Sequence, residues 1–233
     1  MFDLAGRHAL VTGGQRGLGA AITHELLEQG AELVYVTARD PRPSEDPRIV
    51  PIALDVTRAE SVEQLPRLVE DVSVLVNNAG RMAATTSILG SSLDNVRSTF
   101  ETNVLGPIRV VQQLAPMLGG QERSAVVNMH SVLSWLAGTG AYGASKAALW
   151  SVSNSLRLEL AAQGTSVVGV HLSFADTDLT AGLTRVSKVT PAFVARRVVE
   201  GLTRGDAEIL VDTASQEAKA ILSGPVENLV LHM

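Results

Sequence analysis

Tyr142 and Lys146, one helical turn apart, form the pairing in this sequence best suited to proton transfer. They bracket the segment Tyr142-Gly143-Ala144-Ser145-Lys146 at the start of a long helical pattern. Residues four apart share one face of a helix. A phenol has a reference pKa of about 10 and is a poor acid or base at neutral pH, but a neighbouring positive charge favours the phenolate and lowers that pKa. Surface pairing is the competing explanation of the same spacing.

Two further polar residues, Ser131 and Asn103, could complete a site around this pair. Ser131 follows the strand-like segment Ala125–Met129, so it should lie at the carboxyl edge of a sheet, where open α/β folds bind ligands. Its hydroxyl could hold a substrate oxygen while charge develops there. Asn103 is a poor helix former inside a helical pattern, and a water leading to Lys146 would explain it. A structural turn serine remains the alternative for Ser131.

A glycine-rich loop follows the first predicted strand and opens the first predicted helix. It reads Thr12-Gly13-Gly14-Gln15-Arg16-Gly17-Leu18-Gly19. Glycines there allow a sharp turn and a close approach of the backbone to a pyrophosphate, and the helix N-terminus offers free N–H groups. A tight turn alone is the alternative, but the position between strand and helix favours dinucleotide binding. We assign the contacts to Gly13, Gln15, Arg16, Gly17, Leu18 and Gly19.

The end of the second predicted strand indicates which dinucleotide binds. The segment Val36-Thr37-Ala38-Arg39 has no carboxylate for a ribose 2′-hydroxyl. Arg39 can instead pair with a 2′-phosphate through its planar guanidinium, and Arg16 could add a second positive charge. Taken singly, each arginine could be a solvated surface residue. Together they favour NADP(H), with NAD(H) possible.

The segment Asn77-Asn78-Ala79-Gly80 ends the fourth predicted strand. Gly80 allows close backbone approach. Asn78 and Ala79 could contact the cofactor or hold the neighbouring loops, and the residues leave both roles open.

Short β-branched runs alternate with longer helical patterns along the chain. This alternation predicts right-handed βαβ crossovers and a parallel sheet buried on both faces. We therefore predict a Rossmann-type doubly wound α/β fold of about seven strands, with helices on both faces, in one domain spanning 1–233. The expected strands are His8–Thr12, Glu32–Thr37, Ile49–Ala53, Val72–Val76, Ala125–Met129, Ser166–Leu172 and Glu208–Val211. The expected helices are Leu18–Gln29, Arg58–Val69, Leu93–Leu114, Tyr142–Ala162 and Pro191–Gly201, with a kink or an early end at Pro66 and Pro107.

Composition excludes several classes of function. The chain has no cysteine, so disulfides and thiolate chemistry are excluded. The five histidines, His8, His24, His130, His171 and His232, lack metal-ligand spacing, and each is expected to be a surface or satisfied core residue. A net charge of −5 without a basic stripe argues against nucleic acid. No apolar run reaches the roughly 20 residues that span a bilayer, and no signal-peptide pattern is evident, so a cytoplasmic protein is expected.

In the order and type of these motifs, the chain resembles the short-chain dehydrogenase/reductase superfamily. The resemblance extends from Leu10 to about Val211. It rests on the ordered set TGGQRGLG, LDV, NNAG, an Asn within ETN, a Ser after the fifth strand, and YGASK. No single motif is specific, but the ordered set is.

The resemblance implies an NADPH-dependent carbonyl reductase or alcohol dehydrogenase. Tyr142 would be the general acid/base, Lys146 would lower its pKa and bind the nicotinamide ribose, Ser131 would orient the carbonyl, and Asn103 would hold a relay water. The remaining cofactor residues implied are Asp55 and Val56 beside the adenine, Asn78, Ala79 and Gly80 in a cofactor-side loop, and Thr177 near the nicotinamide. The family also implies a homodimer or homotetramer, which would pack through Leu93–Leu114 and Tyr142–Ala162. The substrate is expected to be a small carbonyl or alcohol.

The chain departs from the family pattern in three places. Tyr142 follows Ser131 by eleven residues, about two fewer than usual, so a tightened loop is expected and Ser134 is the fallback serine. Leu172-Ser173 replaces the usual Pro-Gly after the sixth strand. The substrate lid, near 179–190, is short, which suggests an open pocket or one completed by another subunit.

Two alternatives remain. One is a non-catalytic NADP(H)-sensing or regulatory protein on the same fold, which would bind cofactor without turnover. The other is a cofactor-independent dehalogenating relative, but such relatives carry Arg in place of Lys146 and lose the cofactor glycines.

Overall fold

Seven parallel strands form one sheet in the order β3-β2-β1-β4-β5-β6-β7, in a computed structural model that describes residues 2–184 and 186–230. The strands are β1 His8–Thr12, β2 Leu33–Ala38, β3 Ile49–Ala53, β4 Val72–Asn77, β5 Ser124–Met129, β6 Thr165–His171 and β7 Glu208–Leu210. The predicted doubly wound α/β fold is therefore confirmed. The bounds of β1 and β3 are as expected, and the other strands differ by one residue at one or both ends.

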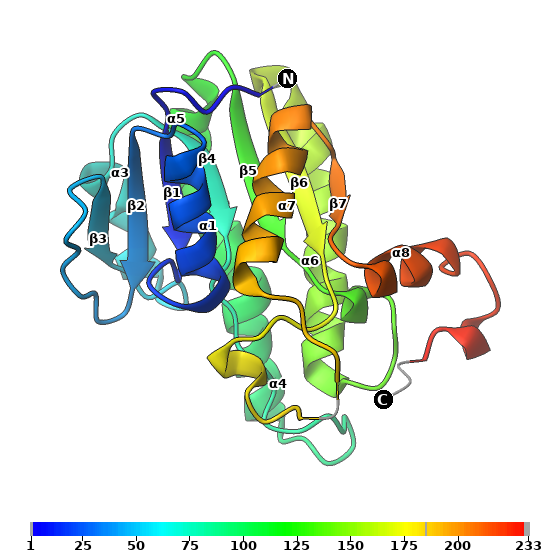
Figure 1. The fold of residues 1–233 in the computed structure, drawn as a ribbon. Coiled ribbons are helices and arrows are strands. Elements are labelled where there is room, and N and C mark those ends of the chain that lie inside the picture. The colour runs from blue at the N-terminus through cyan, green and yellow to red at the C-terminus, as the bar shows by residue number, and fades with distance from the viewer. Residues whose placement is uncertain (1, 185, 231–233) are drawn as a thin grey trace.

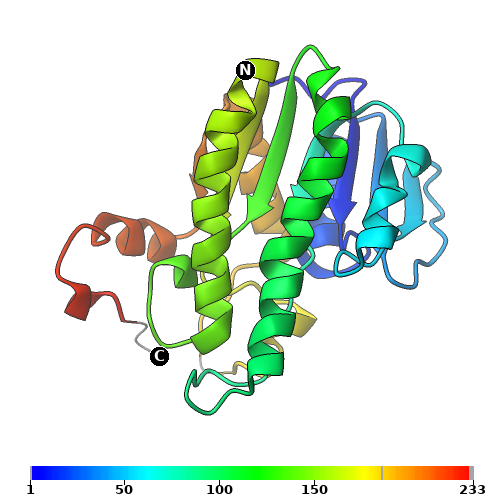
Figure 2. The same cartoon turned by 180° about the vertical axis from the view of Figure 1, so that it is seen from behind.

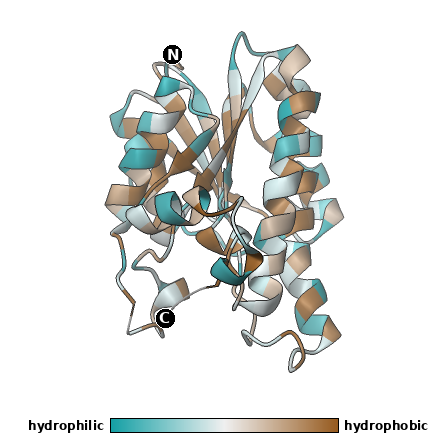
Figure 3. Ribbon diagram, turned by 90° about the vertical axis from the view of Figure 1, so that its right-hand side faces the viewer, coloured by the Kyte–Doolittle hydropathy of each residue, from teal (hydrophilic) through white to brown (hydrophobic). Residues whose placement is uncertain are grey.

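Helices cover both faces of this sheet. The helices α1 (Gly17–Glu28) and α7 (Pro191–Arg204) lie against one face. Viewed from behind, α5 (Gly106–Gly119) and α6 (Gly140–Glu159) run across the other face (Figure 2). Each layer encloses its own apolar core, because strand side chains alternate between the two faces. Figure 3 shows apolar residues running along the strands between the layers.

Prolines and a π-helical turn divide two of the expected helices. The expected helix Arg58–Val69 is two short helices, α2 (Ala59–Glu63) and α3 (Leu65–Leu68), with Pro66 in the first turn of α3. The expected helix Leu93–Leu114 is α4 (Leu93–Phe100), a π-helical turn and α5, with Pro107 in the first turn of α5. Proline tolerates the first turn of a helix because its missing N–H is not needed there.

The C-terminal region contains a helix that the sequence did not reveal. Helix α8 (Thr213–Ala220) begins at Asp212, whose side chain accepts a hydrogen bond from the Ser215 amide at 2.8 Å. It lies beside β7, at one side of the sheet (Figure 1). Its eight residues are too few for a clear period of 3.6, which is why the pattern was missed.

The strand order reverses between β1 and β4, which lie side by side although β2 and β3 come between them in the chain. Such a reversal opens a crevice at the carboxyl ends of the strands, where open α/β sheets bind ligands. In Figure 1 all strand arrows point to the lower edge, where the glycine loop, α4 and the segment after β6 gather. The site is built at this edge.

Candidate active site

Tyr142 and Lys146 lie in the first two turns of α6 and are both directed to the carboxyl end of β5. The Lys146 ammonium donates a hydrogen bond to the Met129 carbonyl oxygen at 2.7 Å. The same nitrogen lies 5.8 Å from the centroid of the Tyr142 ring. Lys146 is only 5% exposed, so its charge stands in a region of low dielectric. The structure thus brings the pair together at the sheet edge.

Burial sets the acidity of both groups. It raises the pKa of Tyr142 to about 12, and a hydrogen bond with the Ser131 side chain lowers it only in part. Burial also lowers the pKa of Lys146 to about 8. The sequence argument expected the Tyr142 pKa to fall, whereas in the chain by itself burial of the phenol shifts it upward. A Tyr142 phenolate at neutral pH therefore needs a further positive charge beside the ring.

Ser131 lies next to the Tyr142 phenol. Its hydroxyl is close enough to that phenol to lower the pKa of Tyr142, and it accepts a hydrogen bond from the Leu133 amide at 3.2 Å, which begins a 3₁₀ helix over Val132–Ser134. The fallback residue, Ser134, has a buried hydroxyl without a hydrogen-bond partner among the described residues. The shortened loop to Tyr142 therefore leaves Ser131 beside the phenol, as expected.

Asn103 lies in the π-helical turn Glu101–Leu105 and is fully buried. Its carbonyl oxygen accepts from the Arg81 amide at 2.9 Å, and its amide donates to the Arg81 carbonyl and to the Ser145 hydroxyl, each at 3.0 Å. A π-turn inside an α-helix often marks a functional site. Here Asn103 fastens the loop after β4 to α6, and this structural task accounts for most of its hydrogen-bonding capacity.

The glycine loop is shaped for close approach to a ligand. Gly13 and Gly17 have φ angles of +64° and +54°, which favour glycine. A Cβ added to Gly19 would lie 2.3 Å from the Gly13 carbonyl oxygen and 2.6 Å from the side-chain nitrogen of Asn78. Such a cradle, which side chains would fill, suits a pyrophosphate on the N-terminus of α1. The residues present therefore fit a dinucleotide.

The loop after β4 holds this cradle in place. Asn78 donates from its side chain to the Thr12 and Gly13 carbonyl oxygens at 2.9 and 3.2 Å. The Thr12 hydroxyl accepts from the Asn78 and Ala79 amides, each at 3.0 Å. The sequence left open whether Asn78 contacts the cofactor or holds the neighbouring loops. In the structure its side chain holds the glycine loop. Gly80 lies next to this support, and a Cβ there would be 3.9 Å from the Lys146 ammonium.

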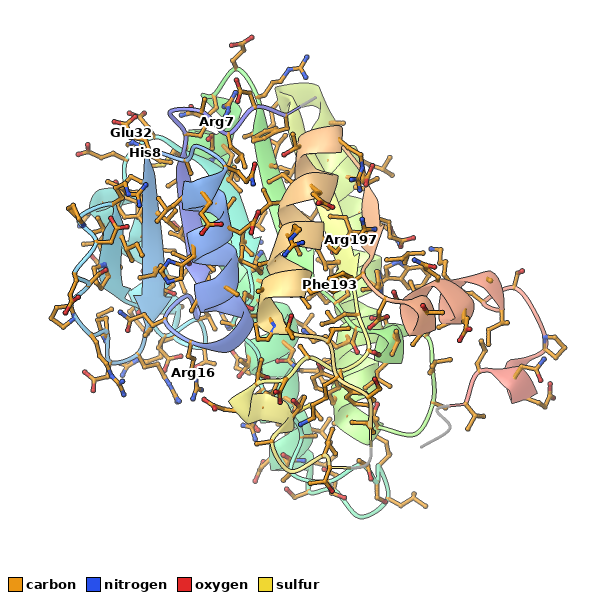
Figure 4. All side chains as sticks on the ribbon, viewed as in Figure 1. Arg7, His8, Arg16, Glu32, Phe193 and Arg197 are labelled. Carbon is orange, nitrogen blue, oxygen red and sulfur yellow. The ribbon has the colours of Figure 1, made fainter. Side chains whose placement is uncertain are left out.

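The other loop residues divide between exposed and engaged positions. Gln15 exchanges two hydrogen bonds with the Arg42 backbone at 2.6 and 2.9 Å, so its side chain links the glycine loop to the segment after β2. Leu18 packs on the core beneath α1. Arg16 projects outward from the lower edge of the molecule (Figure 4), with its guanidinium 3.9 Å from the Asp178 carboxylate. Thr177 lies under Gly17, with its methyl 3.3 Å from where a Cβ would stand.

Arg39 and Asp55 lie at the end of the site expected for the adenine. Burial raises the pKa of the Asp55 carboxyl, but hydrogen bonds from Thr57 and the charges of Arg39 and Arg58 lower it on balance. Val56 is buried against Gly106, and a Cβ added to Gly106 would lie 2.9 Å from the Val56 side chain. Arg39 is exposed, and an exposed guanidinium at this position suits a phosphate ligand.

Two histidines near the site were not recognised from the sequence. His130 and His171 follow Met129 and Val170, which are paired across β5 and β6. Their rings are in hydrogen-bond contact at 3.0 Å, and both are buried. The strand register brings them together, and spacing along the chain carries no trace of it.

The described residues were compared with the patterns of metal sites and membrane spans. Among residues 2–184 and 186–230, no three histidine, cysteine or acidic side chains gather as metal ligands would. No helix in the same residues has the length and apolar character needed to cross a bilayer.

Comparison with known proteins gives a matching family model and similar oxidoreductases. A family model described as short chain dehydrogenase matches residues 7–188. The chain is similar to an uncharacterized oxidoreductase of Saccharomyces cerevisiae, with 34% identity over 164 residues that cover 66% of this chain and 50% of that protein. The chain thus spans about half the length of that relative. An uncharacterized oxidoreductase of Staphylococcus epidermidis is 29% identical over 210 residues, covering 84% of this chain and 90% of its own.

A solved structure extends the likeness to nearly every residue. A short chain dehydrogenase from Burkholderia cenocepacia, determined in complex with NADP, aligns with a TM-score of 0.91 and 28% identity. The alignment covers 98% of this chain and 97% of that one.

Proposed function

The chain belongs to the short-chain dehydrogenase family, and from that premise we propose that it is an NADPH-dependent oxidoreductase that interconverts a carbonyl compound and its alcohol. The observation that carries the proposal is the contact of the Ser131 hydroxyl with the Tyr142 phenol, beside an ammonium anchored on the end of β5. A phenol, a hydroxyl and a positive charge thus lie together at one sheet edge. That set serves carbonyl reduction, in which negative charge develops on an oxygen.

The residues around the crevice would hold the dinucleotide along its length. The glycine loop would take the pyrophosphate, Arg39 the 2′-phosphate, Asp55 and Val56 the adenine side, and Lys146 the nicotinamide ribose with the N–H groups not used by Met129. When bound, the nicotinamide supplies or accepts the hydride. Thr177, under Gly17, would border the nicotinamide. The Burkholderia relative, crystallised with NADP, supports this choice, and NADH remains a second substrate in the proposal.

The protein's own part in reduction is to orient one oxygen and to protonate it. Ser131 would donate a hydrogen bond to the substrate oxygen, and Tyr142 would give up its phenolic proton to that oxygen. The phenolate left behind would be stabilised by the Lys146 ammonium, which is worth more in this buried site than in water. In oxidation the same groups would act in reverse, with Tyr142 as the base.

The segment near 179–190 would act as a short lid over the substrate. It is tied back by the Asp176 and Val189 amides, which donate to the Val189 and Phe174 carbonyl oxygens, each at 2.9 Å. Residue 185 lies outside the described residues. Assembly as a homodimer or homotetramer, in the cytoplasm, completes the proposal.

Absorbance at the reduced-nicotinamide band tests the proposed function. NADPH and NADH are each mixed with ketones, aldehydes, quinones and oxidised steroids, and NADP⁺ with alcohols including hydroxysteroids. We expect NADPH to be consumed with at least one carbonyl class, faster than NADH. A protein that binds NADPH but consumes none, even in a single turnover with any of these compounds, would be the non-catalytic alternative.

Cofactor preference should depend on Arg39. Replacing Arg39→Asp removes the guanidinium and places a negative charge where a 2′-phosphate would lie. Because a charge-assisted hydrogen bond contributes about 1.5–3 kcal/mol, the ratio of kcat/KM for NADPH to that for NADH should fall by about tenfold or more. Arg67→Asp makes the same charge change on exposed α3 and should leave the ratio unchanged. An unchanged ratio in Arg39→Asp would refute the 2′-phosphate assignment.

A further inference from the structure

A buried pair of histidines lies directly against the backbone of Ser131. His171 is fully buried and His130 is 2% exposed. His171 Nε2 and His130 Nδ1 are 3.0 Å apart, and His171 Nδ1 lies 3.2 Å from the Ser131 carbonyl oxygen. The second nitrogen of His130 contacts the Ser153 hydroxyl at 2.9 Å. All four ring nitrogens therefore have partners.

The Ser131 carbonyl determines the tautomer of His171. A carbonyl oxygen only accepts hydrogen bonds, so Nδ1 must carry a proton and donate it. The other nitrogen, Nε2, then faces His130 and, at 3.5 Å, the Glu208 carboxylate. Both a neutral ring, accepting from His130, and a protonated ring, paired with Glu208, satisfy these contacts. In both states the donor to Ser131 is kept.

The plane of the His171 ring is fixed from two further sides. The Trp135 ring stacks on it, with 3.9 Å between centroids and 16° between planes. Glu208 in turn accepts from the Lys219 ammonium of α8 at 2.6 Å and from the Trp150 indole at 3.3 Å. The hydrogen bond with His171 is the largest cause that lowers the pKa of Glu208 to about 2, so this carboxylate stays charged. The ring is thus held by β7, α8 and the 3₁₀ turn together.

The backbone on either side of Ser131 is held by ordinary strand pairing. The His130 amide donates to the Val170 carbonyl at 2.8 Å, and the Val132 amide donates to the Leu172 carbonyl at 3.0 Å. The Ser131 carbonyl lies between these anchors and accepts from His171 and from the Ser134 amide at 3.0 Å. Of these contacts, the one from His171 is the only side-chain contact on that peptide group among the described hydrogen bonds. A displacement of this peptide group would shift the Ser131 Cα and, with it, the Ser131 hydroxyl.

We propose that His171 is a positioning residue for the reaction, because its Nδ1–H anchors the Ser131 peptide and so keeps the Ser131 hydroxyl against the Tyr142 phenol. The proposal rests on the proposed function for its kinetic consequence. A buried histidine that only fills the core would tolerate any substitution of equal packing quality. A positioning histidine should depend on a donor at one particular ring position.

Three substitutions separate these two roles. The amide nitrogen of His171→Asn stands near the place of Nδ1 and keeps the donor to Ser131. That of His171→Gln stands near the place of Nε2 and loses it, while His171→Leu has no donor. Since displacing a reacting group by about 1 Å can cost about 10²-fold, kcat should fall by about 10²-fold in His171→Leu and His171→Gln. The KM and Kd for NADPH should change little, and His171→Asn should recover most of kcat.

His8→Leu is the matched control for loss of an imidazole. His8 Nδ1 also contacts a backbone carbonyl, that of Glu70, at 3.0 Å, but at the opposite end of the sheet from Arg16 and the glycine loop (Figure 4). We expect kcat to be unchanged in His8→Leu. Wild-type kcat in His171→Leu would overturn the proposal. The proposal would also be overturned if kcat fell equally in all three His171 variants and in proportion to their loss of thermal stability.

A second measurement is independent of activity. Nitrogen-15 NMR of histidine-labelled wild-type protein reports which ring nitrogens are protonated. We expect a protonated Nδ1 for His171 throughout the pH range in which the protein is folded. A bare Nδ1 would overturn the proposal even if no substrate had been found, whereas failure of the proposed function would show as wild-type inactivity with Nδ1 protonated.

Discussion

Tyr142→Phe should lower kcat by about 10²–10⁴-fold, the range that a positioned acid/base contributes, while NADPH binds nearly as well as before. The substitution removes one oxygen and keeps the ring that packs beside Lys146. Without the phenol, the variant lacks the acidic proton that would be given to the substrate oxygen beside Ser131. Steady-state rates together with the Kd for NADPH, from quenching of protein fluorescence, measure the two effects separately.

The chain supplies a close control for this change. It has one other tyrosine, Tyr35, whose buried phenol oxygen accepts a hydrogen bond from the Glu70 amide at 3.1 Å. Tyr35→Phe removes the same atom from a core position in β2, so kcat should not change. A Tyr142→Phe enzyme with undiminished kcat would refute the acid/base role, and equal losses in both variants would indicate a general effect of deleting a phenol.

Gly19→Ala should weaken the binding of NADPH by about tenfold to a hundredfold. The added methyl would lie 2.3 Å from a backbone oxygen of Gly13 and 2.6 Å from Asn78, far inside van der Waals contact. The glycine loop must therefore move, and overpacking of this kind costs about 1–3 kcal/mol, which is the stated range in Kd. Titration of NADPH by calorimetry, with thermal unfolding in parallel, would measure both consequences.

Gly120→Ala, in the turn between α5 and β5, is the corresponding control. The nearest described atoms to a Cβ at Gly120 lie 3.4 and 3.6 Å away, in ordinary contact, and its φ of −78° suits any residue. The Kd for NADPH should therefore stay at its wild-type value. If Gly19→Ala bound NADPH as tightly as wild type, the glycine loop would not be the pyrophosphate cradle.

The fold was readable from the sequence because buried parallel strands leave a simple pattern. Runs such as His8–Thr12 and Ile49–Ala53 are mainly apolar, and their bounds match the structure. Breaks inside helices were less readable. Pro66 and Pro107 each signalled a break, but the π-helical form of the turn that holds Asn103 has no sequence signal beyond a poor helix former in mid-pattern.

Some features of the site could likewise be predicted from the sequence, and others could not. Local spacing was sufficient to place Tyr142 beside Lys146, since one helix turn relates them. The direction of the Tyr142 pKa was not accessible, because it depends on how much of the fold covers the ring. The contact of His171 with Ser131 depends on strand register, which spacing along the chain does not reveal. The contacts made by Leu172-Ser173 were also not predictable, because the partner of Ser173 is distant in sequence: its backbone N–H and its hydroxyl donate to the Asp212 carboxylate at 2.9 and 2.6 Å.

Because β1 and β4 are neighbours in the sheet, a shortened form of the protein that lacks β4 would also lack part of the site. The Thr12 hydroxyl donates to the Val76 carbonyl across 64 residues of chain, so the crevice exists only once both segments are present. A fragment ending before Val72 would retain every glycine of the cradle but lack the asparagine that supports them. Nucleotide binding therefore requires two segments that are distant in sequence, the glycine loop and the loop after β4. We expect that the glycine segment alone, placed in another protein, would not bind a nucleotide.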